Sequence, residues 1–168
     1  MEIDSENLLA KDRLQVLNQL STPNIVKINP VDIIEIDNEQ IIGNGYLAET
    51  TYPNADAVIL LNQFSHEILT NGQTRYTTHQ IIKLLTHRGI KQYDDIAIPY
   101  NPDAQHLTVN QARTILSDGS IYQSETFNRV TPPGLLEYNL YSDTVWHVIS
   151  MSALEPGCTI EYQVSIED

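Results

Sequence analysis

The sequence predicts a mainly β fold, an antiparallel β-sandwich built from hairpins, and three observations indicate it. Residues 159–166 alternate apolar and polar side chains, which is the period-two pattern of a strand with one buried face. Three turn signals, Asn71-Gly72, Asp118-Gly119 and Pro156-Gly157, separate runs rich in β-branched residues. No regular helical pattern lies between these hairpins, so parallel βαβ units are not expected.

The Asn71-Gly72 pair is expected to close a two-residue hairpin, because both central residues of a type I′ turn need positive φ. That register pairs His66 with Thr77 and makes His66 and His79 diagonal neighbours on one face. Two imidazoles at this separation reach one metal ion, but no third ligand is evident on that face. We therefore expect solvated or hydrogen-bonded histidines and predict no metal site.

The other two turn signals are expected to close hairpins as well. Asp118-Gly119 would join residues 107–117 to 120–130. Pro156-Gly157 fits a type II turn and would make the end of the chain, from Thr144 onward, an antiparallel hairpin. Between the hairpins at Asn71-Gly72 and Asp118-Gly119, Gly89 is expected to break the chain before a single helical turn.

A length of 168 residues suits one domain with a core plus an N-terminal appendage. We predict a helical or irregular segment over residues 1–50 and an antiparallel β domain over residues 51–168. Residues 5–20 carry an apolar stripe at helical spacing, and residues 31–37 and 40–42 are expected to be short strands. The stripe consists of Ala10, Leu14, Leu17 and Leu20.

The charge balance argues against several partners. With 22 acidic and 9 basic residues and a net charge of −13, the surface should repel phosphate backbones and anionic membranes, so no nucleic-acid partner is expected. No apolar run is long enough to span a bilayer, and the charged residues 1–20 do not form a signal peptide, which makes a cytoplasmic location the default. A single cysteine excludes an internal disulfide.

Catalytic and metal sites are not predicted. Cys158 follows a turn, where neither a base in reach nor an oxyanion hole is evident, and the nearest candidate base is His147 on the neighbouring strand. Asp94-Asp95 and Asp103 flank an oxygen-rich loop at residues 99–102 that calcium would favour, but their spacing matches no EF-hand. We expect solvated carboxylates, no cofactor and no enzyme activity.

Aromatic residues on predicted loops and strands are the candidate ligand contacts. Such rings stack on sugars or capture peptides, although they can equally complete the core. The candidates are Tyr100, Tyr138, Tyr141 and Trp146.

Several segments, in this order and spacing, resemble the bacterial domain of unknown function found immediately N-terminal to a transglutaminase-like (papain-like cysteine) core. The segments are residues 52–61, 81–103, 112–120, 141–143, 154–157 and 160–162. The resemblance covers residues 52–168 and implies an all-β, non-catalytic module, often in exported proteins. The family has no established ligand or catalytic residue, so no site is carried over.

The expected function is that of a non-catalytic accessory or scaffold domain, with a downstream transglutaminase-like domain or another protein as its partner. The alternative is a free-standing carbohydrate- or peptide-binding domain that uses the aromatic residues. In the family the sheet continues beyond Tyr162, whereas this chain stops at Asp168. Strand 159–166 is therefore expected to expose an edge, which predicts a homodimer through that strand or its protection by the N-terminal segment.

Overall fold

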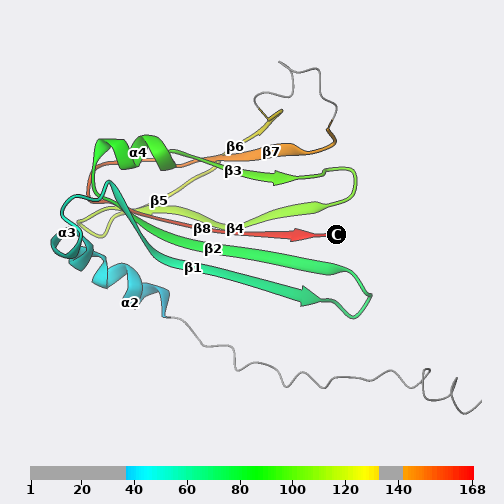
Figure 1. Cartoon of the computed structure of the whole chain (residues 1–168), viewed down its shortest axis with the longest axis horizontal. Helices are drawn as coiled ribbons and strands as arrows, with labels where there is room; N and C mark the ends of the chain where they lie inside the picture. The colour runs from blue at the N-terminus through cyan, green and yellow to red at the C-terminus, as the bar shows by residue number, and fades with distance from the viewer. Residues whose placement is uncertain (1–36, 133–141) are drawn as a thin grey trace, which may run out of the picture. The chain divides into compact units, whose positions relative to one another are not determined.

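The computed structural model describes residues 37–132 and 142–168, and within them the chain forms two antiparallel sheets (Figure 1). The large sheet has the strand order β1-β2-β8-β4-β5, and the small sheet has the order β3-β7-β6. The strands are β1 (Ala57–Ile68), β2 (Thr74–Leu84), β3 (Asp95–Tyr100), β4 (His106–Ile115), β5 (Ile121–Gln123), β6 (Thr126–Val130), β7 (Val145–Ser150) and β8 (Thr159–Glu167). The predicted all-β class is confirmed. The N-terminal stripe and all but the last residue of the strand expected at residues 31–37 lie outside the described residues.

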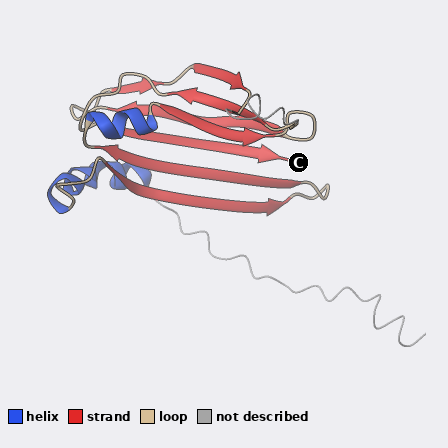
Figure 2. Ribbon diagram, turned by 45° about the horizontal axis from the view of Figure 1, so that its top comes forward, coloured by secondary structure: helices blue, strands red, loops and turns tan. Residues whose placement is uncertain are grey.

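The helices are short and flank the strands (Figure 2). They are α2 (Asn38–Gly43), the 3-10 helix η1 (Asn44–Tyr46), α3 (Leu47–Thr51) and α4 (His87–Tyr93). The prediction of a strand at residues 40–42 is wrong, because Asp37 caps a helix there and accepts a hydrogen bond from the Gln40 amide at 3.0 Å.

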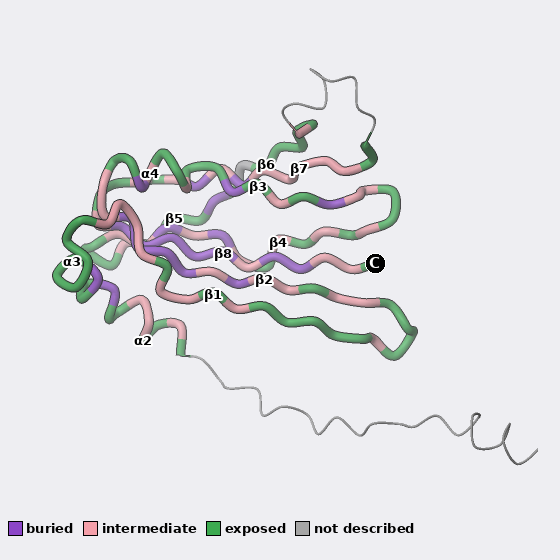
Figure 3. The backbone as a smooth tube through the Cα atoms, viewed as in Figure 1, coloured by how far each residue is buried: buried purple, intermediate pink, exposed green. Residues whose placement is uncertain are grey.

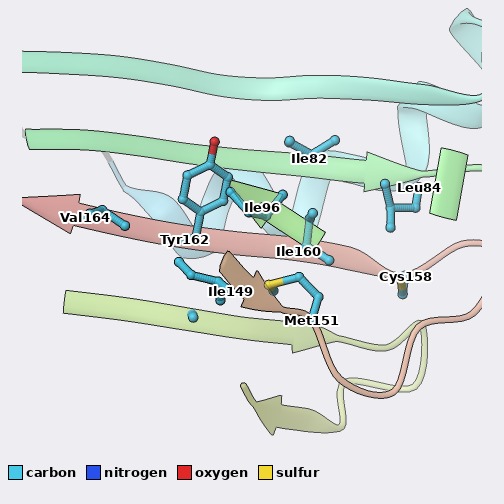
Figure 4. Close-up of a cluster of buried hydrophobic side chains, with 10 residues drawn as sticks. Ile82, Leu84, Ile96, Ile149, Met151, Cys158, Ile160, Tyr162 and Val164 are labelled. Atoms are coloured by element: carbon cyan, nitrogen blue, oxygen red, sulfur yellow. The ribbon is translucent and has the colours of Figure 1, made fainter. Parts of the chain in front are cut away.

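The core lies between the two sheets (Figure 4). We call the side of the large sheet that faces the small sheet its inner face, and the opposite side its outer face. The buried cluster draws on β2, β4 and β8 of the large sheet, on β3 and β7 of the small sheet, and on the chain that links the sheets. Its members are Ile82, Leu84, Ile96, Ala112, Ile149, Met151, Cys158, Ile160, Tyr162 and Val164.

Strand β8 has the predicted alternation, with Ile160 and Tyr162 on the inner face, but it does not lie at an edge. It pairs with β2 on one side and with β4 on the other. The expected exposed edge at residues 159–166 is therefore wrong, and the homodimer inferred from it loses its basis. Figure 3 shows the difference between the buried central strand β8 and the exposed far half of the edge strand β1.

The first hairpin is in the predicted place but has a different register. Leu69 donates its amide to the Gln73 carbonyl at 2.8 Å, and Gly72 has φ of 86°, so the loop holds three residues with glycine in the left-handed region. His66 consequently pairs with Tyr76, one residue away from the prediction. His66 and His79 lie on opposite faces of the sheet, which rules out the shared metal that the two-residue turn allowed.

The predicted hairpin at Asp118-Gly119 is present, because β4 pairs with β5 in antiparallel register and Leu116 donates its amide to the Ser120 carbonyl at 2.9 Å. The hairpin predicted at Pro156-Gly157 is wrong in its strand partners. The type II turn at Pro156-Gly157 is present, with the Cys158 amide 3.1 Å from the Glu155 carbonyl and Gly157 at φ of 88°. However, β7 belongs to the small sheet and β8 to the large one. The run over residues 120–130 likewise divides into β5 of the large sheet and β6 of the small sheet. Each of these two runs therefore passes from one sheet to the other.

Helix α4 connects β2 of the large sheet to β3 of the small sheet, and Gly89 lies inside it rather than breaking it. Thr86 caps the helix by accepting hydrogen bonds from the amides of Arg88 and Gly89, both at 3.2 Å. A Cβ added at Gly89 would lie 2.1 Å from the Asp56 carbonyl oxygen. A glycine is therefore required here by the close approach of two backbones.

Candidate functional site

The outer face of the large sheet carries polar side chains in facing pairs across β2 and β8. Arg75 lies opposite Glu167, and Thr77 lies opposite Ser165. The Thr77 and Ser165 hydroxyls are 2.9 Å apart. Because the inner face of β8 already packs in the core between the sheets, this polar face is free to serve a purpose other than core formation.

A buried ionic network lies on this face, and we call it the Glu161 network after its central carboxylate. Glu161 is 3% exposed and His79 is 6% exposed, and His79 Nε2 lies 2.8 Å from Glu161 Oε1. Arg113 on β4 donates from Nε to Glu161 Oε2 at 2.5 Å. The same guanidinium donates from Nη2 to Glu39 of α2 at 2.8 Å. The network therefore spans three strands and ties a helix to the sheet.

The electrostatics of the network favour the ionised carboxylate. Burial alone would raise the pKa of Glu161, but hydrogen bonds from His79 and Arg113 outweigh it and hold that pKa below its usual value. Burial opposes the charge of Arg113 as well, yet hydrogen bonds to Glu39 and Glu161 raise its pKa. Both charges are thus maintained at neutral pH by their partners, which fixes the side chains of the central strands in position.

Next to this network, towards the far end of β8, lies a shallow depression of about 420 Å³, which we call the polar depression. Arg75 donates to Glu167 at 2.6 Å within it, and Asn110 donates to the Ser165 hydroxyl at 2.7 Å. The lining residues are Ser65, Glu67, Arg75, Thr77, Thr108, Asn110, Gln163, Ser165 and Glu167. A surface of hydroxyls, amides and paired charges can bind a ligand through many hydrogen bonds, and it carries no candidate nucleophile–base pair.

A second hollow, of about 450 Å³, lies where η1 and α3 meet the outer face. Lys83, only 7% exposed, donates to the Gly157 carbonyl there and lies 3.8 Å from Glu49 of α3. Both of these contacts hold the ammonium group to the surrounding fold. We therefore interpret this hollow as a structural junction between the helical segment and the sheet.

The predicted aromatic contacts do not form one surface among the described residues. Tyr100 is the last residue of β3 and does not lie in a loop. Its side chain is 7% exposed and accepts a hydrogen bond from Arg129 at 2.9 Å. Tyr100 pairs with Val145 and Trp146 pairs with Pro99, so the two rings lie on opposite faces of the small sheet. Tyr138 and Tyr141 lie outside the described residues. A ligand role for any of the four stays a prediction.

Cys158 is fully buried within the core, and burial raises the pKa of its thiol. His147 belongs to the other sheet, where its ring stacks on Phe127 at 5.5 Å between centroids, and burial lowers its pKa. Asp95 accepts a hydrogen bond from Ser150 at 2.6 Å. Within residues 37–132 and 142–168, no group of three His, Cys, Asp or Glu side chains is placed to bind a metal ion.

Sequence reasoning missed the Glu161 network and the polar depression. The available signal was the presence of Arg113 and Glu161 inside strongly β-prone runs, where a charge needs a partner. Finding that partner required the strand order, because Arg113 and Glu161 are separated by 48 residues and His79 and Glu161 by 82.

Comparison with known proteins identifies the family. The family model DUF3857, a domain of unknown function with solved structure, matches residues 70–168, which is more than half of the chain. The chain belongs to the DUF3857 family. No curated protein matches its sequence. Within its described residues, this DUF3857 chain has no helix that is long and apolar enough to cross a membrane.

One solved structure is similar to this DUF3857 chain over most of its length. It is described as "a putative protease from Parabacteroides distasonis ATCC 8503" and aligns with a TM-score of 0.61 and 26% sequence identity. The match covers 67% of this chain but only 23% of that protein. The chain therefore corresponds to less than a quarter of the longer relative.

Proposed function

We propose that this DUF3857 domain is a non-catalytic accessory domain of a transglutaminase-like protein and that the outer face of its large sheet holds a partner domain or protein. The observation that carries the proposal is the similarity to less than a quarter of a much longer protein described as a protease. A region of this size in such a protein suits one module beside a catalytic core.

The state of the single cysteine supports a non-catalytic role. A nucleophilic thiol needs access to substrate and a lowered pKa, and Cys158 has neither, because it is fully buried and its pKa is raised. Its position in the core gives the side chain a packing role instead. Catalysis in the assembly would come from the partner core.

The polar depression supports a binding role. Its charged residues, Glu67, Arg75 and Glu167, lie beside hydroxyl and amide groups. The strands that carry them are fixed by pairing with their neighbours in the sheet. Polar groups fixed in this way lose little conformational entropy when a partner docks. The surface therefore suits a polar segment of a neighbouring protein.

A binding experiment tests this role. The chain is titrated by calorimetry with a separately expressed transglutaminase-like core from the same genome. We expect Arg75→Ala to weaken binding by about tenfold, because it removes the central cation of the depression. The matched control is Arg88→Ala, which removes an arginine that is 82% exposed and lies in α4. A core that does not bind, or that binds both variants equally, would contradict the proposal.

The absence of catalysis has its own test. We expect the purified chain to release no ammonia from glutamine side chains and to cleave no peptide in a protein substrate. Any activity found should be the same in Cys158→Ala as in the unmodified chain. A peptidase or transamidase activity that disappears in this variant would overturn the non-catalytic assignment.

A carbohydrate is the second candidate ligand, because the lining of the depression is rich in hydrogen-bonding groups. Ser65, Thr77, Thr108 and Ser165 supply hydroxyls, and Asn110 and Gln163 supply amides. Polyhydroxylated ligands use such groups, although the rings that usually stack on sugars are absent from this lining. Binding of a soluble peptidoglycan fragment that Asn110→Ala abolishes, without binding of the protein core, would favour this second function.

A further inference from the structure

In the half of the β1–β2 hairpin next to its loop, apolar side chains are uncovered on the inner face of the large sheet. Phe64 is 67% exposed, Ile68 is 79% exposed and Tyr76 is 43% exposed. On the inner face of β8, by contrast, Ile160 is fully buried and Val164 is 2% exposed. Tyr76 belongs to β2, which is paired on both sides, whereas Phe64 and Ile68 belong to β1, whose backbone is also unpaired on one side.

Strand β1 is the edge of the large sheet, and no strand within the described parts of the chain pairs with its outer edge. It is 12 residues long and carries a single formal charge, on Glu67, with neither lysine nor proline. Exposed edges of this length are usually shortened, charged or interrupted, because their free N–H and C=O groups accept further strands. The bulge near Leu60 lies at the opposite end from the exposed apolar residues.

The unpaired backbone groups of β1 and its exposed apolar side chains lie along the same stretch of the strand, so one added strand could contact both. Leu69 donates its amide to the carbonyl of Gln73, the residue just before β2, and hydrogen-bonded residues alternate along an antiparallel strand. The amide groups of Phe64, His66 and Ile68 therefore point away from β2. The rings of His66 and Tyr76 stack at 4.2 Å between centroids, as expected of the closer, non-hydrogen-bonded pairs.

We propose that β1 binds an extended segment of another protein that alternates apolar and basic residues, adding it as a sixth strand to the large sheet. The apolar residues of the added strand would cover Phe64 and Ile68, while a basic residue would lie beside Glu67, whose side chain is 54% exposed on the outer face. The net charge of −13 favours a basic partner and disfavours a second copy of the chain. The edge of β1 meets the polar depression at Ser65 and Glu67, which line it. Strand addition uses the backbone edge and the inner face of β1 instead, so the proposal goes beyond the accessory role and does not depend on it.

The test is fluorescence anisotropy of the full chain with a short labelled peptide that alternates valine and lysine. A control peptide has the same sequence but is N-methylated at every second residue, on the edge that would bond to β1. We expect the unmethylated peptide to bind at least about tenfold more tightly, because methylation removes the donors that an added strand uses. Equal binding of the two peptides to the unmodified chain would overturn the proposal.

Two variants of one residue locate the site. His66→Pro removes an outward amide without breaking a bond to β2, a change that edge strands tolerate, and we expect it to weaken peptide binding about tenfold. His66→Ala loses the ring but keeps the amide, and should bind within about twofold of the unmodified chain. Equal binding by both variants, with both folded by circular dichroism, would contradict strand addition. A dimer seen by light scattering that Phe64→Lys dissociates would also contradict the proposal, because a second copy of the chain would then be the partner bound at β1.

Discussion

Ile160 and Glu161 are neighbours in β8 that are equally hidden from water for opposite reasons. Ile160 is 0% exposed and packs in the core between the sheets, whereas Glu161 is 3% exposed on the outer face and is held by His79 and Arg113. Apolar packing needs only a suitable volume, but a buried carboxylate needs donors at defined positions. Apolar packing on the inner face thus stabilises the fold, whereas hydrogen bonds on the outer face hold polar groups in fixed positions.

The inner face should give the largest effect. We expect Ile160→Ala to lower the free energy of unfolding by about 3 to 4 kcal/mol, because it leaves a cavity in a fully buried site. Urea denaturation monitored by circular dichroism measures the change. Ile160→Val is the control and should cost about 1 kcal/mol. A cost below that value for the alanine variant would mean that the two sheets do not share one core.

On the outer face, burial should decide how much an ion pair contributes. We expect Arg113→Met to lower the free energy of unfolding by about 3 kcal/mol, because it leaves the buried Glu161 with only one of its two partners. Arg75→Met breaks a half-buried pair with Glu167 on the same face that is far more open to water than Glu161, and it should cost less than about 1 kcal/mol. If both substitutions lower the free energy of unfolding by the same amount in urea denaturation, the ion pairs of the Glu161 network are no more stabilising than the pair in the polar depression.

A substitution in helix α4, which connects the two sheets, should have a smaller effect on the free energy of unfolding. We expect Gly89→Ala to cost about 2 kcal/mol in thermal or urea unfolding, because the new methyl group would overlap the Asp56 carbonyl. Gly43→Ala is the matched control, since it also lies in a helix but has no atom within 4 Å of the added carbon. It should be neutral or slightly stabilising. A harmless alanine at residue 89 would show that α4 does not approach β1 as closely as described.

The smallest effect concerns the cysteine. We expect Cys158→Ala to cost about 1 kcal/mol, which is the loss of one small buried apolar group. The turn position alone predicts almost no cost, so this substitution separates a residue at a turn from a residue in the core. A melting temperature unchanged from that of the unmodified chain would favour the turn interpretation.

The sequence predicts local features of this fold better than its long-range pairings. Alternation located β8 and the glycine turns located the loops, because both are properties of a few neighbouring residues. The one-residue error at Asn71-Gly72 arose because two-residue and three-residue loops accept the same pair of residues. That error was enough to move His66 to the other face.

The sheet partners were not predictable from pattern alone. β7 and β8 are close in sequence and a type II turn lies between them, yet they pair with strands from elsewhere in the chain. The candidate site depends on that choice, because Glu161 meets His79 and Arg113 only when β8 lies between β2 and β4. Helix α2 was missed for a different reason, since the capping signal at Asp37 was outweighed by the β-branched residues that follow it.

An ionised Glu161 is the group that holds His79 and Arg113 together on the outer face of the large sheet. The measurement that tests this most directly is the free energy of unfolding of the unmodified chain and of Glu161→Gln, by urea denaturation at a series of pH values from 7 downward. Because the pKa of Glu161 is lowered in the folded chain, its contribution is complete above its unfolded pKa of about 4.3 and is lost as the pH falls through the folded value. We predict a difference of about 3 kcal/mol near neutral pH that narrows only below about pH 4.3. A difference that is small at pH 7, or that stays constant into the acid range, would contradict the account.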